Sequence, residues 1–339
     1  MTPLIALLAL ATSQGDAPNH RGCRVGLTLN VSVNGGVPEL LANAKEARRL
    51  GCDISAMSVK WSDLEPTAGA LKVDRLNWDL RNTVNTGFVP MLTLQTIDTN
   101  NRTLPADLKS EAWDSPKMLA REVAFLKAVG AVLPKEIGAV MLGNEVDGYL
   151  PSHPSEIKPY LEFLRAGRET LKAADPGVQV GVTTMFNSLA NDTGLISLIQ
   201  KNMDLVSMTY YPLGSNFAVL PVDDVGKHIA KMVAFAGSRK LFIQEAGFPA
   251  SPLLGSSDEK QVKFVDALFD AMVKHRDRLI GVCYFLLVDL NDKLVDSLVG
   301  YYGLQSDTFR AYLSTLGLKK QDGAPRPSWE EFKKRATGY

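Results

Sequence analysis

The sequence predicts an α/β protein, a single-domain (β/α)8 TIM barrel, on three observations. Short apolar runs alternate along the chain with segments that carry apolar residues at helical spacing. The runs are almost continuously apolar, as in a parallel sheet covered on both faces. A doubly wound sheet is the alternative, but neither GxGxxG nor GxxxxGK[ST] follows any run.

Eight strands are expected, at residues 24–30, 54–60, 88–95, 138–145, 179–186, 205–211, 241–247 and 282–289. Amphipathic spacing predicts helices at 37–51, 115–134, 158–176 and 257–279. The first helix ends at Gly51, a favoured cap, and the last begins with Ser and Asp and an acidic first turn. A short helix around 328–336 is expected to pack on the barrel.

The composition of the chain limits the classes of function and the number of domains that are expected. The 339 residues, 45% of them hydrophobic, would also fit two domains, but no linker or second domain is evident, so residues 23–335 are expected to form one catalytic domain. Lys and Arg (37) balance Asp and Glu (37), which gives no basic excess for nucleic acid or an anionic membrane. No apolar run is long enough to span a bilayer. We expect a monomer.

The first residues, MTPLIALLALA, are typical of a signal-peptide core, with Ala9-Leu10-Ala11 as a cleavage motif but no preceding Lys or Arg. Residues 1–22 are therefore interpreted as a signal peptide or a disordered N-terminus. The protein is expected to be secreted or periplasmic, and otherwise cytoplasmic.

Cysteines and histidines form no metal-binding pattern, since neither CxxC nor HExxH occurs. Cys23, Cys52 and Cys283 precede or begin expected strands. A Cys23–Cys52 disulfide stays open for an exported chain, but buried free thiols are favoured. We expect no metal and no other cofactor.

Two carboxylates end expected strands. Asn144-Glu145 ends the fourth and Glu245 the seventh, positions that face each other across a narrow barrel mouth. Two facing carboxylates suit glycoside hydrolysis, in which one protonates the leaving oxygen and the other acts while ionised. The alternatives are a loop cap for Glu145 and a structural ion pair for Glu245.

The motifs GNE (143–145) and QEAGFP (244–249) resemble clan A glycoside hydrolases, the retaining "four–seven" TIM barrels, without identifying the exact family. The resemblance implies that Glu145 is the acid/base, that Asn144 contacts the sugar 2-hydroxyl and that Glu245 is the nucleophile.

Two further motifs extend the resemblance over residues 24–305. KWSDLEPTAGALKVDRLNWDL (60–80) is similar to the W-x-x-L-E-P-x-x-G stretch after the second strand of several clan A families, including xylanases and β-xylosidases. SMTYYP (207–212) is similar to the sixth-strand segment whose tyrosine hydrogen-bonds the nucleophile. That tyrosine is assigned as Tyr211, with Tyr210 adjacent.

The chain also departs from the clan. Lys60 stands where many members carry an arginine, and Phe285, with Tyr284, where many carry a tryptophan under the sugar. We expect Lys60, Phe285 and Tyr210 to bind substrate. Trp61 is expected to be a sugar-stacking platform, with core packing as the alternative.

Several other polar and aromatic residues near the strand ends are open to structural interpretations. Glu65 is expected to order its loop. Solvated loop acids are expected at Asp98, Asp147 and Asp289, with sugar binding as the alternative. Subsite lining and loop packing are equal alternatives for Tyr149 and Phe248. The sequons at Asn30, Asn101 and Asn191 are interpreted as chance matches.

The sequence thus predicts a retaining glycoside hydrolase that cleaves β-glycosidic bonds of an oligo- or polysaccharide by double displacement. A non-catalytic carbohydrate-binding barrel and a transglycosylase on the same scaffold are the alternatives. The sugar, the linkage and the choice between endo and exo action stay open.

Overall fold

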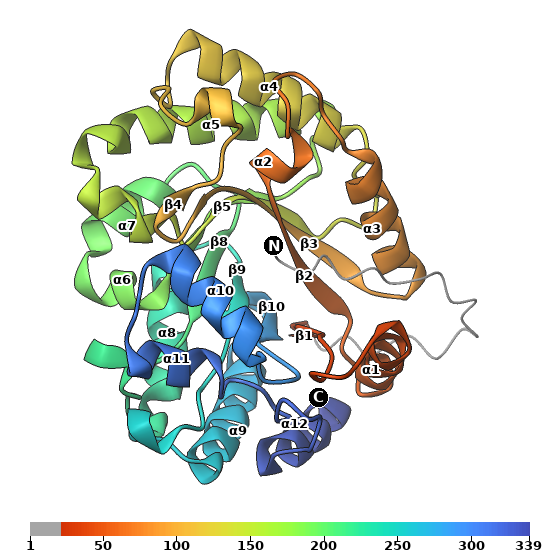
Figure 1. The fold of residues 1–339 in the computed structure, drawn as a ribbon. Coiled ribbons are helices and arrows are strands. Elements are labelled where there is room, and N and C mark those ends of the chain that lie inside the picture. The colour runs from red at the N-terminus through yellow and green to blue at the C-terminus, as the bar shows by residue number, and fades with distance from the viewer. Residues whose placement is uncertain (1–21) are drawn as a thin grey trace. The chain divides into compact units, whose positions relative to one another are not determined.

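The computed structural model describes residues 22–339, in which strands and helices alternate as the sequence predicts (Figure 1). The strands of this part of the chain form one sheet in the order β6-β5-β3-β2-β1-β10-β9-β8-β7, with β4 paired to β3. Pairs β1–β10, β1–β2, β9–β10, β3–β5 and β5–β6 are parallel. This topology confirms the predicted TIM-barrel fold class. The candidate signal peptide lies outside the described residues, except for Gly22.

The chain folds as two compact units, each described here by itself. The first holds residues 56–85 and 89–208, and the second holds 22–55, 86–88 and 209–339. Consequently strand β2, Ile54–Lys60, begins in the second unit and ends in the first, whereas β8, Val206–Tyr210, begins in the first and ends in the second. The predicted domain bounds, 23–335, stay a prediction.

The first unit packs its helices over a hydrophobic cluster that includes Leu94, Phe125, Leu142 and Phe163. Helices α4 and α5 lie side by side (Figure 1). Besides β2 and β8, this unit contains α2 (Trp61–Leu64), α3 (Asp74–Asn85), β3 (Val89–Asp98), β4 (Asn101–Arg102), α4 (Pro116–Gly130), β5 (Ala139–Asn144), α5 (Ile157–Ala174), β6 (Val180–Gly181), β7 (Thr183–Met185), α6 (Phe186–Asn191) and α7 (Thr193–Gln200).

The second unit places α9 against both α8 and α12, which confirms that the C-terminal helix packs on the fold. A smaller apolar cluster of Val295, Val299, Phe309 and Leu313 joins α10 to α11. The elements of this unit are β1 (Arg24–Leu27), α1 (Val37–Arg49), α8 (Val225–Ala236), β9 (Leu241–Ala246), α9 (Asp258–Lys274), β10 (Leu279–Tyr284), α10 (Asp292–Tyr302), α11 (Asp307–Leu313) and α12 (Pro327–Gly338).

Capping residues fix the helix starts near the predicted positions. The Ser115 hydroxyl accepts a hydrogen bond from the Met118 N–H at the start of α4. Ser257 caps α9 in the same way through Lys260. Each cap satisfies a backbone donor that has no partner within the first helical turn.

The predicted eighth strand, 282–289, is displaced from the observed one. Strand β10 begins at Leu279 and ends at Tyr284. The apolar run beyond it is buried but irregular, because its backbone bonds to other loops, for example from Leu287 N to the Thr28 carbonyl. Apolar content alone therefore did not mark where the strand stops.

Two other predicted strands are shorter than expected. The first ends at Leu27 instead of Asn30, whose side chain bonds both backbone groups of Val288, at 2.6 and 2.8 Å. The fifth is split into β6 and β7, and Phe186, its expected last residue, begins α6.

Candidate active site

Strand β5 delivers Asn144 and Glu145 through a sharp change of backbone direction. Its six residues are all buried, and it pairs with β3 and β6. Gly143 adopts φ +120°, and a Cβ there would lie 2.6 Å from the Val146 side chain and 2.7 Å from the Tyr160 hydroxyl. Only glycine fits this position, so the GN pair of the motif has a structural cause.

Glu145 itself lies in the left-handed region, at φ +47° and ψ +43°, and precedes the 3-10 turn η2, Val146–Gly148. Its carboxylate is half-buried and accepts a hydrogen bond of 2.7 Å from the Thr99 hydroxyl. A left-handed conformation costs a non-glycine residue about 1–3 kcal/mol, and such strain is concentrated at functional sites. The side chain makes no capping hydrogen bond to η2, which argues against the loop-cap alternative.

Asn144 is held by the neighbouring strand. Its side-chain amide donates to Asp98 at 3.0 Å, and its carbonyl accepts from the Thr99 N–H at 2.9 Å. Asp98 is 4% exposed, so the expected solvated loop acid is in fact a buried hydrogen-bond acceptor.

Asp147 is a second buried carboxyl close to Glu145. Both of its oxygens accept from the Met185 N–H at 3.1 Å, and Ser188 supplies a further hydrogen bond. Burial raises the pKa of Asp147 to about 7, and the charge of Glu145 adds to that increase. The expectation of a solvated acid is wrong here as well.

Glu245 lies on β9 and is half-buried. The Tyr211 hydroxyl donates to its carboxylate at 2.7 Å. The structure therefore brings together the tyrosine and the glutamate that the sequence resemblance paired. A phenol that donates to a carboxylate stabilises its charged form.

Tyr210, the adjacent candidate, is directed elsewhere. It is fully buried, its hydroxyl lies 3.0 Å from a ring nitrogen of His228, and its ring stacks near Phe264. Successive side chains of a strand point to opposite faces, so only one of the two tyrosines can reach Glu245. Its expected role in substrate binding is not supported.

Trp61 is a core residue, and the expected sugar platform is corrected. Its ring is 0% exposed and stacks on Phe125 at a centroid distance of 4.7 Å. The indole N–H donates to Glu65 at 2.7 Å. A ring without exposed surface has no face to offer to a sugar.

Glu65 orders its loop, as expected. It accepts from the Gly69 N–H at 2.6 Å and also pairs with Arg121. The start of the motif therefore encodes a buried pair, Trp61 and Glu65, that anchors the loop up to Gly69. Lys60, the last residue of β2, is half-buried.

Phe285 directly follows β10 and is half-buried. Its ring lies 6.3 Å from that of Tyr211 in an edge-to-face arrangement, and Tyr312 of α11 lies 5.5 Å from the same tyrosine. The second unit thus surrounds the tyrosine that bonds Glu245 with aromatic rings.

The remaining candidates are structural. Asp289 is buried and pairs with Arg326 at 2.6 Å, so it is an ion-pair partner instead of a solvated acid. Burial raises its pKa to about 6. Tyr149 bonds Glu156 and stacks on His153, and Phe248 is fully buried against Phe264.

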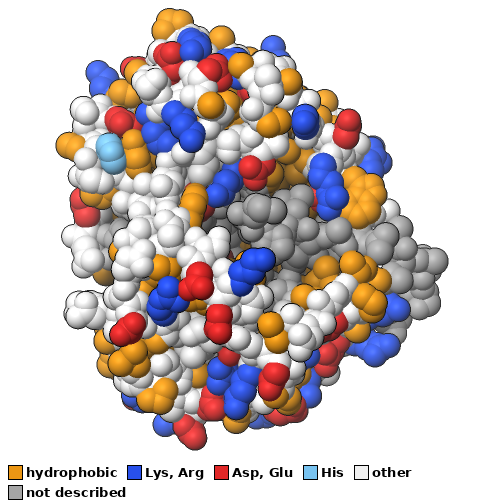
Figure 2. Space-filling model, viewed as in Figure 1, with side chains coloured by type: hydrophobic (Ala, Val, Ile, Leu, Met, Phe, Trp, Pro, Cys, Tyr) orange, Lys and Arg blue, Asp and Glu red, His pale blue; other side chains and the backbone are white. Residues whose placement is uncertain are grey.

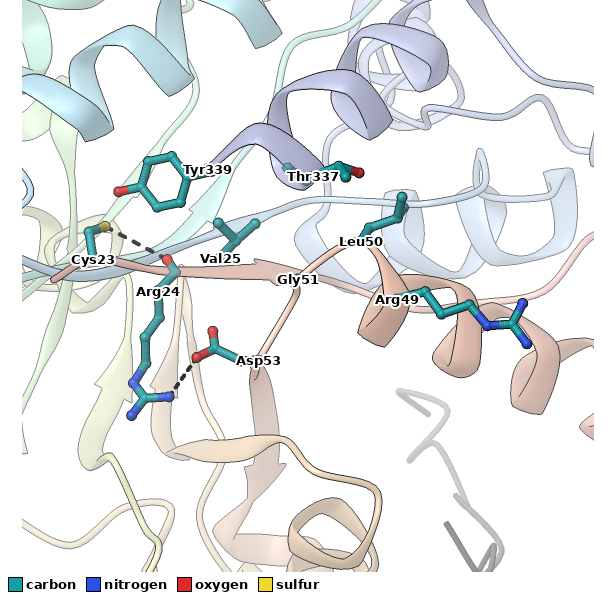
Figure 3. A pocket seen from close by; sticks show the side chains of 10 residues that line it. Cys23, Arg24, Val25, Arg49, Leu50, Gly51, Asp53, Thr337 and Tyr339 are labelled. Carbon is teal, nitrogen blue, oxygen red and sulfur yellow. Dashed lines mark hydrogen bonds and ion pairs between the residues drawn. The ribbon is translucent and has the colours of Figure 1, made fainter. Parts of the chain in front are cut away.

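The three cysteines are free and buried, as expected. Cys23 lines a cavity of about 120 Å³ with Arg24, Asp53 and Tyr339 (Figure 3). The Arg24–Asp53 ion pair of 2.6 Å crosses it, and burial raises the pKa of the Cys23 thiol to about 12. The cavity lies at the amino ends of β1 and β2, away from the ends that carry catalysis in barrels.

Within residues 22–339, no group of three or more His, Cys, Asp or Glu side chains could hold a metal ion. No helix of this region is long and apolar enough to cross a membrane. On the face shown in Figure 2, basic and acidic side chains are interspersed, in keeping with the balanced composition.

Comparison with known proteins finds solved structures that have a similar fold. No protein-family model matches the chain, and no curated protein does. Solved structures do match. A GH5_18 from Streptomyces cattleya, in complex with GlcNAc, has a TM-score of 0.71 at 16% identity and covers 93% of this chain and 80% of its own.

Two other similar structures are a GH5_18 from Bifidobacterium longum subsp. infantis and the exo-beta-1,4-mannosidase Op5Man5 from Opitutaceae bacterium strain TAV5. The first has a TM-score of 0.72 at 15% identity and covers 94% of this chain and 79% of its own. The second has a TM-score of 0.71 at 18% identity and covers 93% and 59%. These neighbours are glycoside hydrolases, and GH5 is part of clan A, so the likeness confirms the predicted resemblance at the level of the fold.

Sequence reasoning missed Thr99, which directly follows β3 and donates a hydrogen bond to Glu145. The segment IDTNN indicates a turn, but nothing in it marks a threonine with φ +54°. Only the pairing of β3 with β5 reveals the contact.

Proposed function

We propose that the protein is a retaining β-glycoside hydrolase in which Glu145 is the acid/base and Glu245 the nucleophile. The hydrogen bond of 2.7 Å from Tyr211 to Glu245 carries the proposal, because the clan A resemblance had assigned that tyrosine to the nucleophile from the sequence. The strained backbone at Glu145 supports a second functional position.

In the first step a Glu245 oxygen attacks the anomeric carbon. The bond to the leaving oxygen breaks, and the proton of Glu145 passes to that oxygen. In the second step Glu145, now ionised, takes a proton from water while the water oxygen attacks the anomeric carbon. The ester to Glu245 breaks, and both carboxyl groups return to their starting states.

Asn144 and Tyr211 have supporting roles in this scheme. The Asn144 amide would contact the sugar 2-hydroxyl, a contact that strengthens in the transition state of such enzymes. The Tyr211 hydroxyl orients Glu245 and favours its ionised form before attack.

The substrate class is taken from the similar structures as a proposal. One is described as an exo-beta-1,4-mannosidase, and another holds Manb1-4GlcNAc. We therefore place β-mannosides, including Manβ1-4GlcNAc, first among candidate substrates, ahead of β-glucosides and β-xylosides.

The test is a panel of aryl β-glycosides and short β-linked oligosaccharides, run with the wild type and with Glu145→Gln and Glu245→Gln. Loss of an acid/base lowers the rate by about 10²–10⁴-fold, and loss of the nucleophile should cost at least as much. A 2-deoxy-2-fluoro glycoside should label Glu245, as mapped by peptide mass spectrometry.

Other outcomes distinguish the proposed hydrolase from the alternative functions. Wild-type activity on the oligosaccharides retained in either Gln variant overturns the assignment, since a sugar leaving group needs the proton that an activated aryl group does not. Sugar binding without turnover by the wild type would indicate a carbohydrate-binding barrel, and glycosyl transfer that dominates at high acceptor concentration would indicate a transglycosylase.

A further inference from the structure

The carboxyl end of β3 holds the residues that end β5. Asp98 accepts a hydrogen bond of 3.0 Å from the Asn144 amide, and the Thr99 hydroxyl donates one of 2.7 Å to Glu145. A third bond, from the Thr99 N–H to the Asn144 carbonyl at 2.9 Å, joins the two backbones. Asp98, the last residue of β3, thus holds Asn144, the last residue of β5. Thr99 and Glu145, which directly follow these strands, form the second contact.

The register between β3 and β5 explains why these residues meet. Leu94 pairs with Leu142, and Asp98 pairs with Asn144, so β3 advances four residues while β5 advances two. Irregularities of this kind bend a strand and redirect its side chains, and β-bulges are common next to active sites.

The backbone at the contact is strained on both sides. Thr99 has φ +54°, a conformation in which a β-branched residue is an outlier, and Glu145 has φ +47°. Close packing holds Thr99 there, since a Cβ on Gly148 would lie 2.6 Å from the Thr99 carbonyl oxygen. Strain of this kind persists only where the surroundings fix it.

We propose that Asp98 and Thr99 are positioning residues for the proposed reaction, with Thr99 orienting the carboxyl of Glu145 and Asp98 orienting the amide of Asn144. The inference rests on the proposed function and assigns the two residues different tasks. Thr99 acts on proton transfer to the leaving group, whereas Asp98 acts on the contact with the sugar.

The two tasks predict different kinetic signatures in kcat/KM, which reports the first chemical step. A 2,4-dinitrophenyl leaving group departs without a proton, but an alkoxide or a second sugar needs one. Thr99→Val should therefore lower kcat/KM by about 10–100-fold for an oligosaccharide, the effect expected for the loss of a hydrogen bond to a charged group. For the dinitrophenyl glycoside, whose leaving group needs no proton, the decrease should be less than about threefold.

Asp98→Ala should lower kcat/KM for both leaving groups by a similar factor of about tenfold, because the sugar contact is independent of the leaving group. On a 2-deoxy dinitrophenyl glycoside, which lacks the hydroxyl that Asn144 would contact, this effect should shrink to less than about threefold.

Three further variants keep the test decisive. Thr99→Ser retains the hydroxyl and should restore the wild-type leaving-group dependence. Gly148→Ala displaces Thr99 without altering it, and should reproduce the Thr99→Val signature. Thr170→Val, which removes a buried hydroxyl bonded to the Ala166 carbonyl in the same unit, is the matched control and should leave that dependence unchanged.

The outcomes separate this inference from the proposed function. If Glu145→Gln abolishes activity but Thr99→Val lowers kcat/KM equally for both leaving groups, the role of Thr99 is overturned while the function stands. A loss for Asp98→Ala that persists on the 2-deoxy substrate overturns the role of Asp98. If Glu145→Gln retains wild-type activity on the oligosaccharide, the proposed function itself fails.

Discussion

The carboxyl ends of β5 and β9 each present one glutamate, but they support it by different means. Glu145 lies beyond the end of its strand in a left-handed turn, next to the buried carboxyl of Asp147. Glu245 lies within strand β9, at a point where the pairing with β10 is irregular, and it receives a phenol hydrogen bond from Tyr211. In the proposed mechanism Glu145 must gain and lose a proton while Glu245 must stay ionised, and these two tasks call for different surroundings.

The largest expected effect tests the different roles of the two glutamates, by replacing each one and adding azide. Glu245→Ala with azide should form a glycosyl azide of inverted configuration, whereas Glu145→Ala with azide should form one of retained configuration, because only the second variant still makes the glycosyl-enzyme. Each variant alone should lose about 10²–10⁴-fold in rate or more. NMR of the azide products distinguishes the two configurations. Exchanged configurations would reverse the assigned roles, and identical configurations would contradict them.

The next largest effect tests Trp61 as a core residue. Trp61→Ala should reduce the free energy of unfolding by about 3–5 kcal/mol, because a fully buried ring leaves a cavity. Chemical denaturation measures the loss. Trp61→Phe, which keeps a ring but leaves Glu65 without the indole donor, should cost about 1–3 kcal/mol. A raised KM with unchanged stability would instead restore the sugar platform.

A smaller effect on activity distinguishes the two neighbouring tyrosines. Tyr211→Phe should lower kcat by about 10–100-fold, since Glu245 loses a charge-assisted hydrogen bond. Tyr210→Phe, which removes the hydroxyl that contacts His228, should change kcat by less than about threefold. Steady-state kinetics on the best aryl glycoside compares them, and equal losses would contradict the assignment of Tyr211.

The smallest expected effect is the pH dependence that Asp147 gives to the free energy of unfolding. Its pKa is raised on folding to about 7, so the folded state binds more protons than the unfolded state between about pH 4 and 7. Stability from this group is therefore lost as pH rises through that window, with a slope of at most about 1.4 kcal/mol per pH unit.

Asp147→Asn should remove this slope in urea unfolding measured at several pH values. Ser188→Ala, which takes away a hydrogen bond that lowers the pKa, should move the decline to higher pH. A wild-type slope retained in Asp147→Asn would show that other groups cause it.

Much of the fold followed from the sequence because a covered parallel sheet leaves a simple signature. Near-continuous apolar runs separated by amphipathic helices predicted strand β2 at its observed bounds, 54–60, and a serine followed by acidic residues predicted the start of α9. The strand displaced to 279–284 shows the limit, since a buried irregular loop is as apolar as a strand.

The sequence by itself placed Glu145, Glu245 and Tyr211 at or next to strand ends, and its resemblance to clan A named them as a set. It could not tell that Trp61 is buried, that Tyr210 points to His228, or that Asp98 and Asp147 are shielded from water. Those properties depend on neighbours from other strands. Only the register that sets Asp98 opposite Asn144 brought Thr99 to Glu145, because hydrogen bonds between strands join residues that are distant in sequence.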